Sequence, residues 1–247
     1  MTVVDAHTHM PGRVFQLADA ATPERFLALM DRYGIDVAWV FTIDGLSFDP
    51  APYNDEVKQF CDYNPARLVP FCCVHPRYAN AQDELRRAVR ELGMKGVKFH
   101  PWLQGFSATD PALDPLGDEM ERLGVPVIFH DGTPPNCSPM QIAYFARRHP
   151  RLTVILGHGG LHDLWKEALH AAELCPNIYI APVSMPMHGL RQSVRRLGAE
   201  RFLFGSDAGF ADPYWQPFNL ARIRALSLPP EQEAAIMGGN AMRILAK

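Results

Sequence analysis

The amino-acid sequence predicts an α/β fold, a single closed barrel of eight parallel strands with helices outside. Eight short apolar segments recur at intervals of roughly 24 to 34 residues, and helical patterns lie between them. The length of 247 residues is close to that of one such (β/α)8 barrel of the TIM type. The segments are mostly continuously apolar, as expected for strands buried on both faces. They are Val3–His7, Val37–Thr42, Leu68–Val74, Gly96–His100, Val125–His130, Thr153–His158, Ile178–Pro182 and Phe202–Ser206.

The intervals carry helix signals of two kinds. Thr22 followed by Pro23 is typical of an N-cap with proline at the first helical position. In Asp83–Leu92 and in Leu161–Ala172 the apolar residues repeat at helical spacing. Strands that alternate with such helices favour a closed barrel.

The tail predicts a helix over Glu231–Ile236, which Gly238 and Gly239 interrupt before a last helical turn. The structural alternative to a barrel is a doubly wound open sheet, which usually has a glycine-rich phosphate turn after its first strand. Here the first strand ends in histidines instead. Because no linker, low-complexity tract or shift in composition divides the chain, we expect residues 1–247 to form one domain.

Composition and charge argue against several classes of partner. The formal net charge is −3 and no basic run is present, so binding to a nucleic-acid backbone is not expected. No segment approaches the roughly 18 apolar residues that span a membrane, and the N-terminus does not resemble a signal peptide. Five cysteines without a CxxC pair indicate free thiols in a reducing compartment. We therefore expect a cytoplasmic protein that acts on a small molecule; a homodimer is an open alternative.

The first predicted strand carries Asp5, His7 and His9 at alternate positions, which share one face of a strand. Positions two apart are separated by about 6.6 Å, so two imidazoles can converge on one ion through bonds of about 2.0–2.1 Å. Taken alone, the pair also fits two core or surface histidines.

Ionisable residues also stand at the ends of the fourth, fifth, sixth and eighth predicted strands. The carboxyl ends of all strands in a parallel barrel open on one rim, so these side chains converge. Burying so many ionisable groups would be costly unless a metal or polar partners satisfied them. The pattern therefore predicts a metal site at this rim. The residues are Lys98, His100, His130, Asp131, His158 and Asp207.

Motifs along nearly the whole chain resemble the amidohydrolase superfamily, and within it the branch that holds aminocarboxymuconate-semialdehyde decarboxylase, γ-resorcylate decarboxylase and several lactone hydrolases. The motifs are DAHTH, GVKFHP, VIFHD, ILGHGG, FLFGSD and GGNAMRIL. The resemblance implies that His7, His9, His130 and Asp207 bind a divalent metal. One zinc ion is our first expectation, because histidine nitrogens and a carboxylate suit it; manganese and iron are alternatives.

The resemblance leaves two positions with alternative roles. His158 corresponds to a histidine that faces the substrate in mononuclear members and binds a second metal in binuclear ones. Lys98 corresponds to a lysine that is carbamylated and bridges two metals in binuclear members. We expect the mononuclear arrangement. Pairing of Lys98, as a buried ammonium, with a carboxylate such as Asp5 is left open, as is a role of Lys98 and Asp5 at a second metal or in support of the first. Further candidates for substrate contacts are His100, Trp102 and Arg13.

These residues predict a hydrolase that cleaves a lactone, amide or ester-like bond with metal-activated water. Asp207 would transfer the proton, and His158 or the metal would stabilise the oxyanion. The alternative is a metal-dependent nonoxidative decarboxylase of an aromatic or muconate-type acid, in which Asp207 or His158 protonates the carbon. Some decarboxylases of this branch replace the first histidine of HxH by glutamate; this sequence keeps both, which favours hydrolysis. A metal-binding barrel without turnover is a third alternative, but the proton-transfer residues are present.

Overall fold

The strands of the computed structural model, which describes residues 1–12, 22–209 and 214–246, form two parallel sheets in the orders β1-β2-β3 and β4-β5-β6-β7. Isolated parallel bridges connect the sheets and the eighth predicted segment: Cys72 with Val97, Ile180 with Phe202, and Thr8 with Ala208. The eight segments therefore follow one another around a closed ring, and the predicted barrel is confirmed. The strands are β1 Val4–His9, β2 Val37–Phe41, β3 Leu68–Pro70, β4 Val97–Phe99, β5 Val127–Phe129, β6 Val154–Leu156 and β7 Ile178–Ile180.

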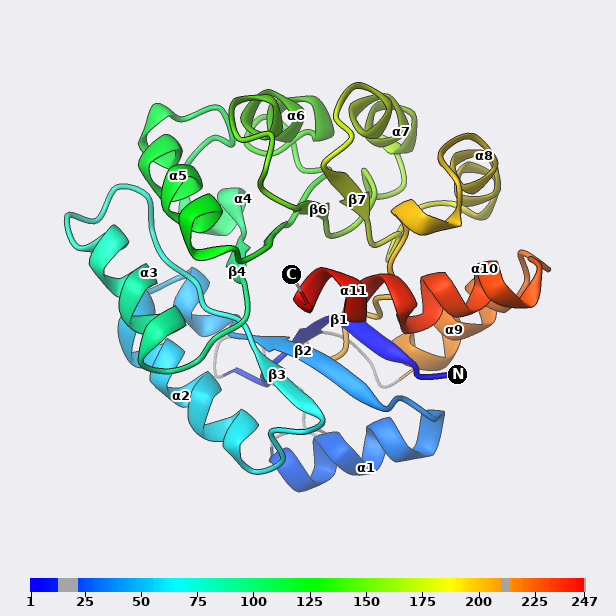
Figure 1. The fold of residues 1–247 in the computed structure, drawn as a ribbon, viewed down its shortest axis with the longest axis horizontal. Helices are drawn as coiled ribbons and strands as arrows, with labels where there is room; N and C mark the ends of the chain where they lie inside the picture. The colour runs from blue at the N-terminus through cyan, green and yellow to red at the C-terminus, as the bar shows by residue number, and fades with distance from the viewer. Residues whose placement is uncertain (13–21, 210–213, 247) are drawn as a thin grey trace.

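Helices surround the strands on the outside (Figure 1). The longer helices are α1 Pro23–Tyr33, α2 Pro50–Asp62, α3 Ala81–Arg90, α5 Asp114–Leu123, α6 Pro139–Arg148, α7 Trp165–Leu174, α8 Met187–Leu197 and α9 Trp215–Arg224. The shorter ones are η2 Asp44–Leu46, α4 Pro101–Gln104, η3 Pro111–Leu113, η4 Ala199–Arg201, α10 Pro230–Ala234, the π-helix η5 Ala235–Gly239 and α11 Asn240–Leu245.

The helix signals in the sequence locate most starts correctly. The Thr22 side chain accepts the backbone N–H of Arg25 and caps α1 as predicted. Helix α7 begins at Trp165, four residues later than expected. The reason is the backbone of Gly160 and Leu161, whose φ values of 84° and 53° are left-handed and incompatible with a right-handed helix.

The prediction that two glycines interrupt the C-terminal helix is wrong. Gly238 and Gly239 lie inside η5, which leads from α10 into α11 without a break. A Cβ on Gly238 would lie 2.2 Å from the backbone oxygen of Thr2. The glycine therefore allows this helix to approach the N-terminal segment closely, and the buried Ile236 and Met237 hold it in place.

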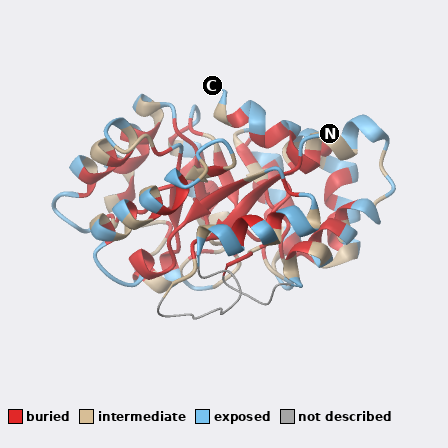
Figure 2. Cartoon of the chain, turned by 90° about the horizontal axis from the view of Figure 1, so that it is seen from below, coloured by how far each residue is buried: buried red, intermediate tan, exposed pale blue. Residues whose placement is uncertain are grey.

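The C-terminal helix closes one end of the barrel. Ala241 and Ile244 of α11 pack in one apolar cluster with Val4, Ile128 and Ile155 from the strands. Both termini lie at this end (Figure 2), so the opposite end carries the loops that follow the strands. A larger apolar cluster lies between the strands and the outer helices.

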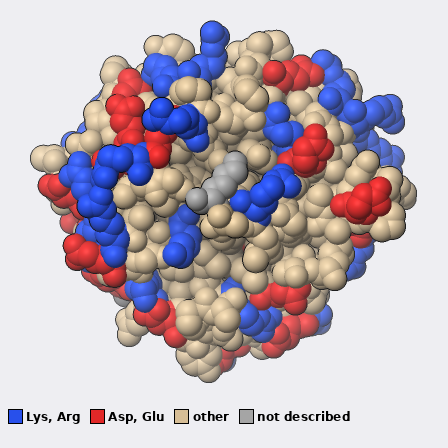
Figure 3. All heavy atoms as spheres, viewed as in Figure 1, with Lys and Arg blue, Asp and Glu red and all other residues tan. Residues whose placement is uncertain are grey.

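On the face that carries the C-terminal helix, basic and acidic side chains are interspersed and form no single patch (Figure 3). Within the described residues, no helix has the length and hydropathy that crossing a membrane requires.

Candidate active site

A β-bulge in β1 sets the direction of the two histidines. The pairing of β1 with β2 shifts between Asp5 and Thr8, and a bulge of this kind redirects the side chains around it. Ala6 belongs to the apolar cluster inside the barrel, yet the adjacent His7 also faces inward, since Lys98 Nζ lies 3.1 Å from its Nε2. The expectation that Asp5 shares the face of both histidines is therefore not met.

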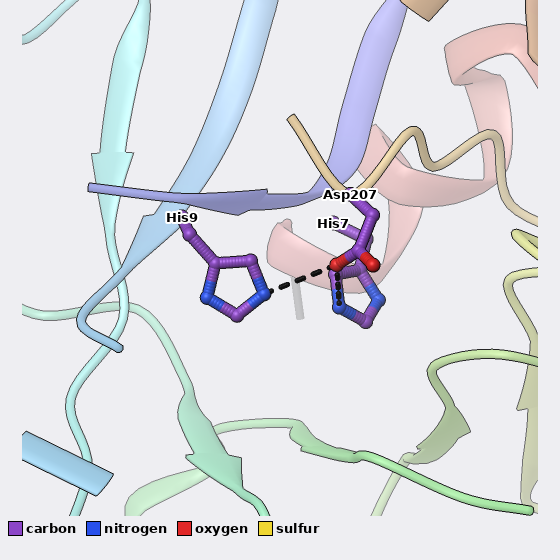
Figure 4. A group of neighbouring side chains, drawn as sticks. All are labelled: His7, His9 and Asp207. Carbon is purple, nitrogen blue, oxygen red and sulfur yellow. Dashed lines mark hydrogen bonds and ion pairs between the residues drawn. The ribbon is translucent and has the colours of Figure 1, made fainter. Parts of the chain in front are cut away.

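His7, His9 and Asp207 converge beside the end of β1 (Figure 4). The Nε2 atoms of His7 and His9 lie 3.3 and 3.2 Å from the same oxygen of Asp207, Oδ1. The potential ligand atoms of the three residues all lie within 4.8 Å of one another. The structure thus brings together three of the four residues proposed as metal ligands.

Asp207 reaches this position through an unusual backbone. Its φ is 67°, a left-handed conformation that aspartate adopts more readily than most residues but that a regular strand excludes. Its N–H donates to the carbonyl of His7 at 2.8 Å. This geometry explains why the eighth segment pairs only through isolated bridges and turns its carboxylate toward β1. Strained residues of this kind cluster at functional sites.

The protonation states suit metal binding. Burial lowers the pKa of His7 and of His9, so both imidazoles are neutral at pH 7. Burial alone would raise the pKa of Asp207, but the hydrogen bond with His9 and the nearby His158 hold it well below its usual range. Two neutral imidazoles and an ionised carboxylate are the forms that coordinate a cation.

The spacing of these atoms also fits one ion. Ligands at about 2.0–2.1 Å in a tetrahedral zinc site are separated by about 3.4 Å. The separations of 3.3 and 3.2 Å between the histidine nitrogens and Asp207 Oδ1 are close to that value. Two of the three separations therefore match one ion, and the third, between the two histidine nitrogens, lies within 4.8 Å.

Asp5 supports the site and does not pair with Lys98, contrary to one expectation. Its carboxylate accepts hydrogen bonds from the N–H and the hydroxyl of Ser206 and from the N–H of His7. Burial raises the pKa of Asp5 to about 7. Its hydrogen bonds tie the strand that carries His7 to the residue that precedes Asp207.

A cavity of about 200 Å³ is lined by two of the three converging residues, His9 and Asp207. Trp102 is 56% exposed and stands at its mouth, whereas the Lys98 side chain is fully buried at its wall. The lining includes most of the polar residues proposed from the sequence, and also Ile43 and Thr133, which no sequence signal singled out. The full lining is His9, Ile43, Lys98, His100, Trp102, His130, Thr133, His158 and Asp207.

His130 lies apart from the three converging residues. Its ring stacks on His100, with centroids 3.7 Å apart and planes inclined by 9°, and its Nε2 lies 2.8 Å from the hydroxyl of Thr133. Burial lowers the pKa of both histidines, that of His100 to about 2. The role of His130 as a fourth ligand stays a prediction, and so does that of His100 as a substrate contact, although His100 lines the cavity.

His158 lines the cavity and lies near both His7 and His130. Its ring centroid is 4.8 Å from that of His7 and 4.4 Å from that of His130. Burial lowers its pKa to about 4. The buried carboxylate of Asp131 holds its backbone, because Asp131 accepts the N–H groups of His158 and Gly160. The sequence showed Asp131 at a strand end but did not reveal this supporting role.

A glycine makes room for His7. A Cβ on Gly157 would lie 2.7 Å from Cε1 of the His7 ring, so a larger residue would displace the imidazole. Arg13, proposed as a substrate contact, lies outside the described residues.

Comparison with known proteins identifies the family. The amidohydrolase model matches residues 4–247, nearly the whole chain. The protein belongs to the amidohydrolase family. Amidohydrolases are enzymes that generally bind a divalent metal, and the cluster of His7, His9 and Asp207 is a candidate site for it.

Among curated amidohydrolase relatives, the 2-amino-3-carboxymuconate-6-semialdehyde decarboxylase of Dictyostelium discoideum is 34% identical over 98 residues, 37% of this chain and 26% of that protein. The 5-carboxyvanillate decarboxylase LigW from Sphingomonas paucimobilis has a similar structure, with a TM-score of 0.76, 19% identity and 99% coverage of both chains. The 2,6-dihydroxybenzoate decarboxylase from Rhizobium gives a TM-score of 0.71 and 20% identity, over 100% of this chain and 99% of that one. At these identities the two structures support the fold.

Proposed function

We propose that this amidohydrolase is a metal-dependent nonoxidative decarboxylase of a small aromatic or muconate-type carboxylic acid. The observation that carries the proposal is that the relatives described above are named as decarboxylases, one from sequence and two from structure. This support reverses the preference for hydrolysis that the intact HxH motif suggested.

The size of the cavity agrees with such a substrate. A cavity of about 150 Å³ holds benzene, so a volume of about 200 Å³ accommodates one ring or a planar chain with small substituents. Trp102 at the mouth and the stacked rings of His100 and His130 supply flat surfaces against which such a molecule can lie.

The residues present can carry out the necessary proton transfer. In decarboxylation the bond between the carboxylate carbon and its neighbour breaks, carbon dioxide leaves, and the electron pair left on the neighbouring carbon takes up one proton. His7, His9 and Asp207 would hold a divalent ion, which supplies positive charge for orienting the substrate carboxylate and an adjacent oxygen. Asp207 and His158 both line the cavity. Because Asp207 is ionised and His158 is neutral at pH 7, one of them would first take a proton from water or from a substrate hydroxyl and then pass it to the carbon.

Hydrolysis of a lactone or other ester-like bond is the second candidate, and one observation favours it. The pKa of Asp207 lies well below its usual range, because interactions with His9, His158 and His7 outweigh the burial that raises it. A carboxylate that is ionised at neutral pH is a proton acceptor, which hydrolysis requires at the attacking water.

Product analysis distinguishes the two reactions. The protein is loaded with zinc or manganese and incubated with hydroxybenzoic and unsaturated dicarboxylic acids labelled with ¹³C at the carboxyl carbon, and in parallel with a panel of lactones. We expect labelled carbon dioxide and bicarbonate in the NMR spectrum. Acid release from lactones without label release from any acid would replace the proposal by hydrolysis.

Elemental analysis tests the metal site independently of turnover. We expect about one equivalent of metal per chain in the wild-type protein and its loss in His9→Ala, which removes one of three converging ligands. His162→Ala is a matched control, because that imidazole is 79% exposed. Full metal occupancy in His9→Ala would refute the ligand assignment.

A further inference from the structure

Lys98 is a buried cation that no carboxylate of the described residues contacts directly; Asp207 and Asp131 act on its charge only from a distance. The side chain is fully buried, and in the strand register it aligns with Ile128 of β5, a member of the apolar cluster inside the barrel. Its stem thus starts from an apolar layer, while its ammonium reaches the wall of the cavity. Burial of an ammonium is costly unless a partner of opposite charge compensates it.

The contacts of Lys98 do not supply such a partner. Nζ lies 3.1 Å from His7 Nε2 and 4.6 Å from the centre of the Phe41 ring. Across residues 1–12, 22–209 and 214–246, no carboxylate forms an ion pair with it. An ammonium has three donors, and a single nitrogen acceptor satisfies only one of them.

The nearby carboxylates are committed elsewhere. Asp5 accepts hydrogen bonds from Ser206 and from its own strand, and Asp131 accepts two backbone N–H groups. Asp207 contacts His7 and His9. Each is close enough to influence the site but has its oxygens directed at other donors.

Metal binding would remove the one nitrogen acceptor that Lys98 has. His7 Nε2 faces both Lys98 Nζ, at 3.1 Å, and Asp207 Oδ1, at 3.3 Å. If that nitrogen coordinates an ion beside Asp207, its lone pair is no longer available to the ammonium. Of the contacts described, only the weaker one with the Phe41 ring would remain.

We propose that Lys98 remains an unmodified ammonium and binds a second anionic oxygen of the substrate, distinct from the carboxylate directed at the metal. This inference deepens the proposed function and rests on it. It restricts the substrate to acids with a further carboxylate or an ionised hydroxyl, since such an oxygen supplies the missing partner. A carbamylated Lys98 that bridges two metals is the competing arrangement.

Binding of inert acids tests the proposal without turnover. Benzoate carries one carboxylate and isophthalate carries two. Calorimetric titration of the zinc-loaded protein with each acid measures how much the second carboxylate increases the binding affinity. We expect isophthalate to bind at least tenfold more tightly than benzoate. In Lys98→Met this ratio is expected to fall to near one, because a thioether offers no positive charge. Equal ratios in wild type and Lys98→Met, or no binding of either acid to the wild type, would overturn the proposal.

A matched variant and a fold check accompany the titration. Lys95→Met removes an exposed lysine three residues earlier and is expected to keep the wild-type ratio. Because replacing an incompletely paired buried charge by an apolar side chain is often neutral or stabilising, Lys98→Met is expected to melt no lower than wild type.

Modification of the wild-type lysine is measured directly. ¹³C NMR of the zinc-loaded wild-type protein in labelled bicarbonate is expected to show no carbamate carbon. A carbamate signal together with two equivalents of metal would overturn the inference. The decarboxylation proposal is judged separately, by release of label from the substrate panel, so the two can fail independently.

Discussion

The two ends of the barrel are built from the same strands but differ in chemistry. At the end closed by α11, Val4 and Ala6 of β1 pack with Ile244 in an apolar cluster. At the other end, His7 and His9 of the same strand contact Asp207, and His9 and Asp207 line the cavity. The comparison indicates that one end stabilises the barrel, whereas the other end holds buried ionisable groups at a cost in stability.

The largest expected effect is a loss of turnover in Asp207→Asn, a substitution confined to the open end of the barrel. Asp207→Asn should fold normally, since asparagine also tolerates the left-handed φ of this position. Turnover should fall about 1,000-fold, as is usual when a proton-transfer group is lost. The measurements are kcat and the melting temperature. Asp163→Asn is the control, because that side chain is 95% exposed. A near-wild-type kcat in Asp207→Asn would remove Asp207 from its catalytic role.

Acid should destabilise the metal-free protein through the buried ionisable groups at the open end of the barrel. Five buried histidines have pKa values lowered by burial, so unfolding lets them take up protons below pH 6.5. They are His7, His9, His100, His130 and His158. Two carboxyls act in the opposite sense, because burial raises the pKa of Asp5 to about 7 and that of Asp131 to about 6, so unfolding releases their protons.

The balance between protons taken up by the histidines and protons released by the two carboxyls determines how the free energy of unfolding changes with pH. Five protons gained and two released leave a net uptake of about three, so the free energy of unfolding should decrease by up to about 4 kcal/mol per pH unit as the pH falls from about 6 to 4.5. Urea denaturation of the metal-free protein across this window measures it. A stability independent of pH would show that the histidines are not buried as neutral groups.

Part of this arrangement could be read from the sequence. The eight apolar segments, and the ionisable residues that follow them, predict the barrel and the end at which Lys98, His158 and Asp207 meet. This works because the carboxyl ends of parallel strands must open on one rim, whatever the details of each strand.

The remainder depends on local geometry that no residue pattern encodes. The bulge in β1 turns both Ala6 and His7 inward, whereas simple alternation would place them on opposite faces. The ring of His130 stacks on His100 because of packing within the cavity. The partnership of Asp5 with Ser206 joins residues 201 positions apart in the chain, a separation at which sequence spacing carries no information.

A cavity at the closed end should have a smaller effect, and only on stability. Ile244→Ala removes a side chain that is 3% exposed, and such changes cost about 2–5 kcal/mol. Metal content and kcat at low temperature are expected to match wild type, because the substitution lies in the cluster at the opposite end. Met242→Ala on the same helix is the control, since that residue is 48% exposed. Loss of metal in Ile244→Ala would break the proposed division between the two ends.

The smallest effect expected is that of Asp131→Asn, which tests whether the open end is organised beyond the residues that touch the cavity. The carboxylate accepts the N–H of His158 through Oδ1, at 2.7 Å, and that of Gly160 through Oδ2. An asparagine has only one acceptor oxygen, so its amide nitrogen would face one of the two N–H donors and displace the loop that positions His158.

We expect a 10- to 100-fold decrease in kcat, the size typical for outer supports of a metal site, while metal content stays at the wild-type level. Kinetics with ¹³C-labelled substrate and elemental analysis of the same samples measure both quantities. Restoration of the rate in Asp131→Glu is not expected, because the longer side chain does not fit the fully buried position. A wild-type rate in Asp131→Asn would show that the position of His158 is set by the barrel itself, and that only the groups lining the cavity distinguish its open end from its closed one.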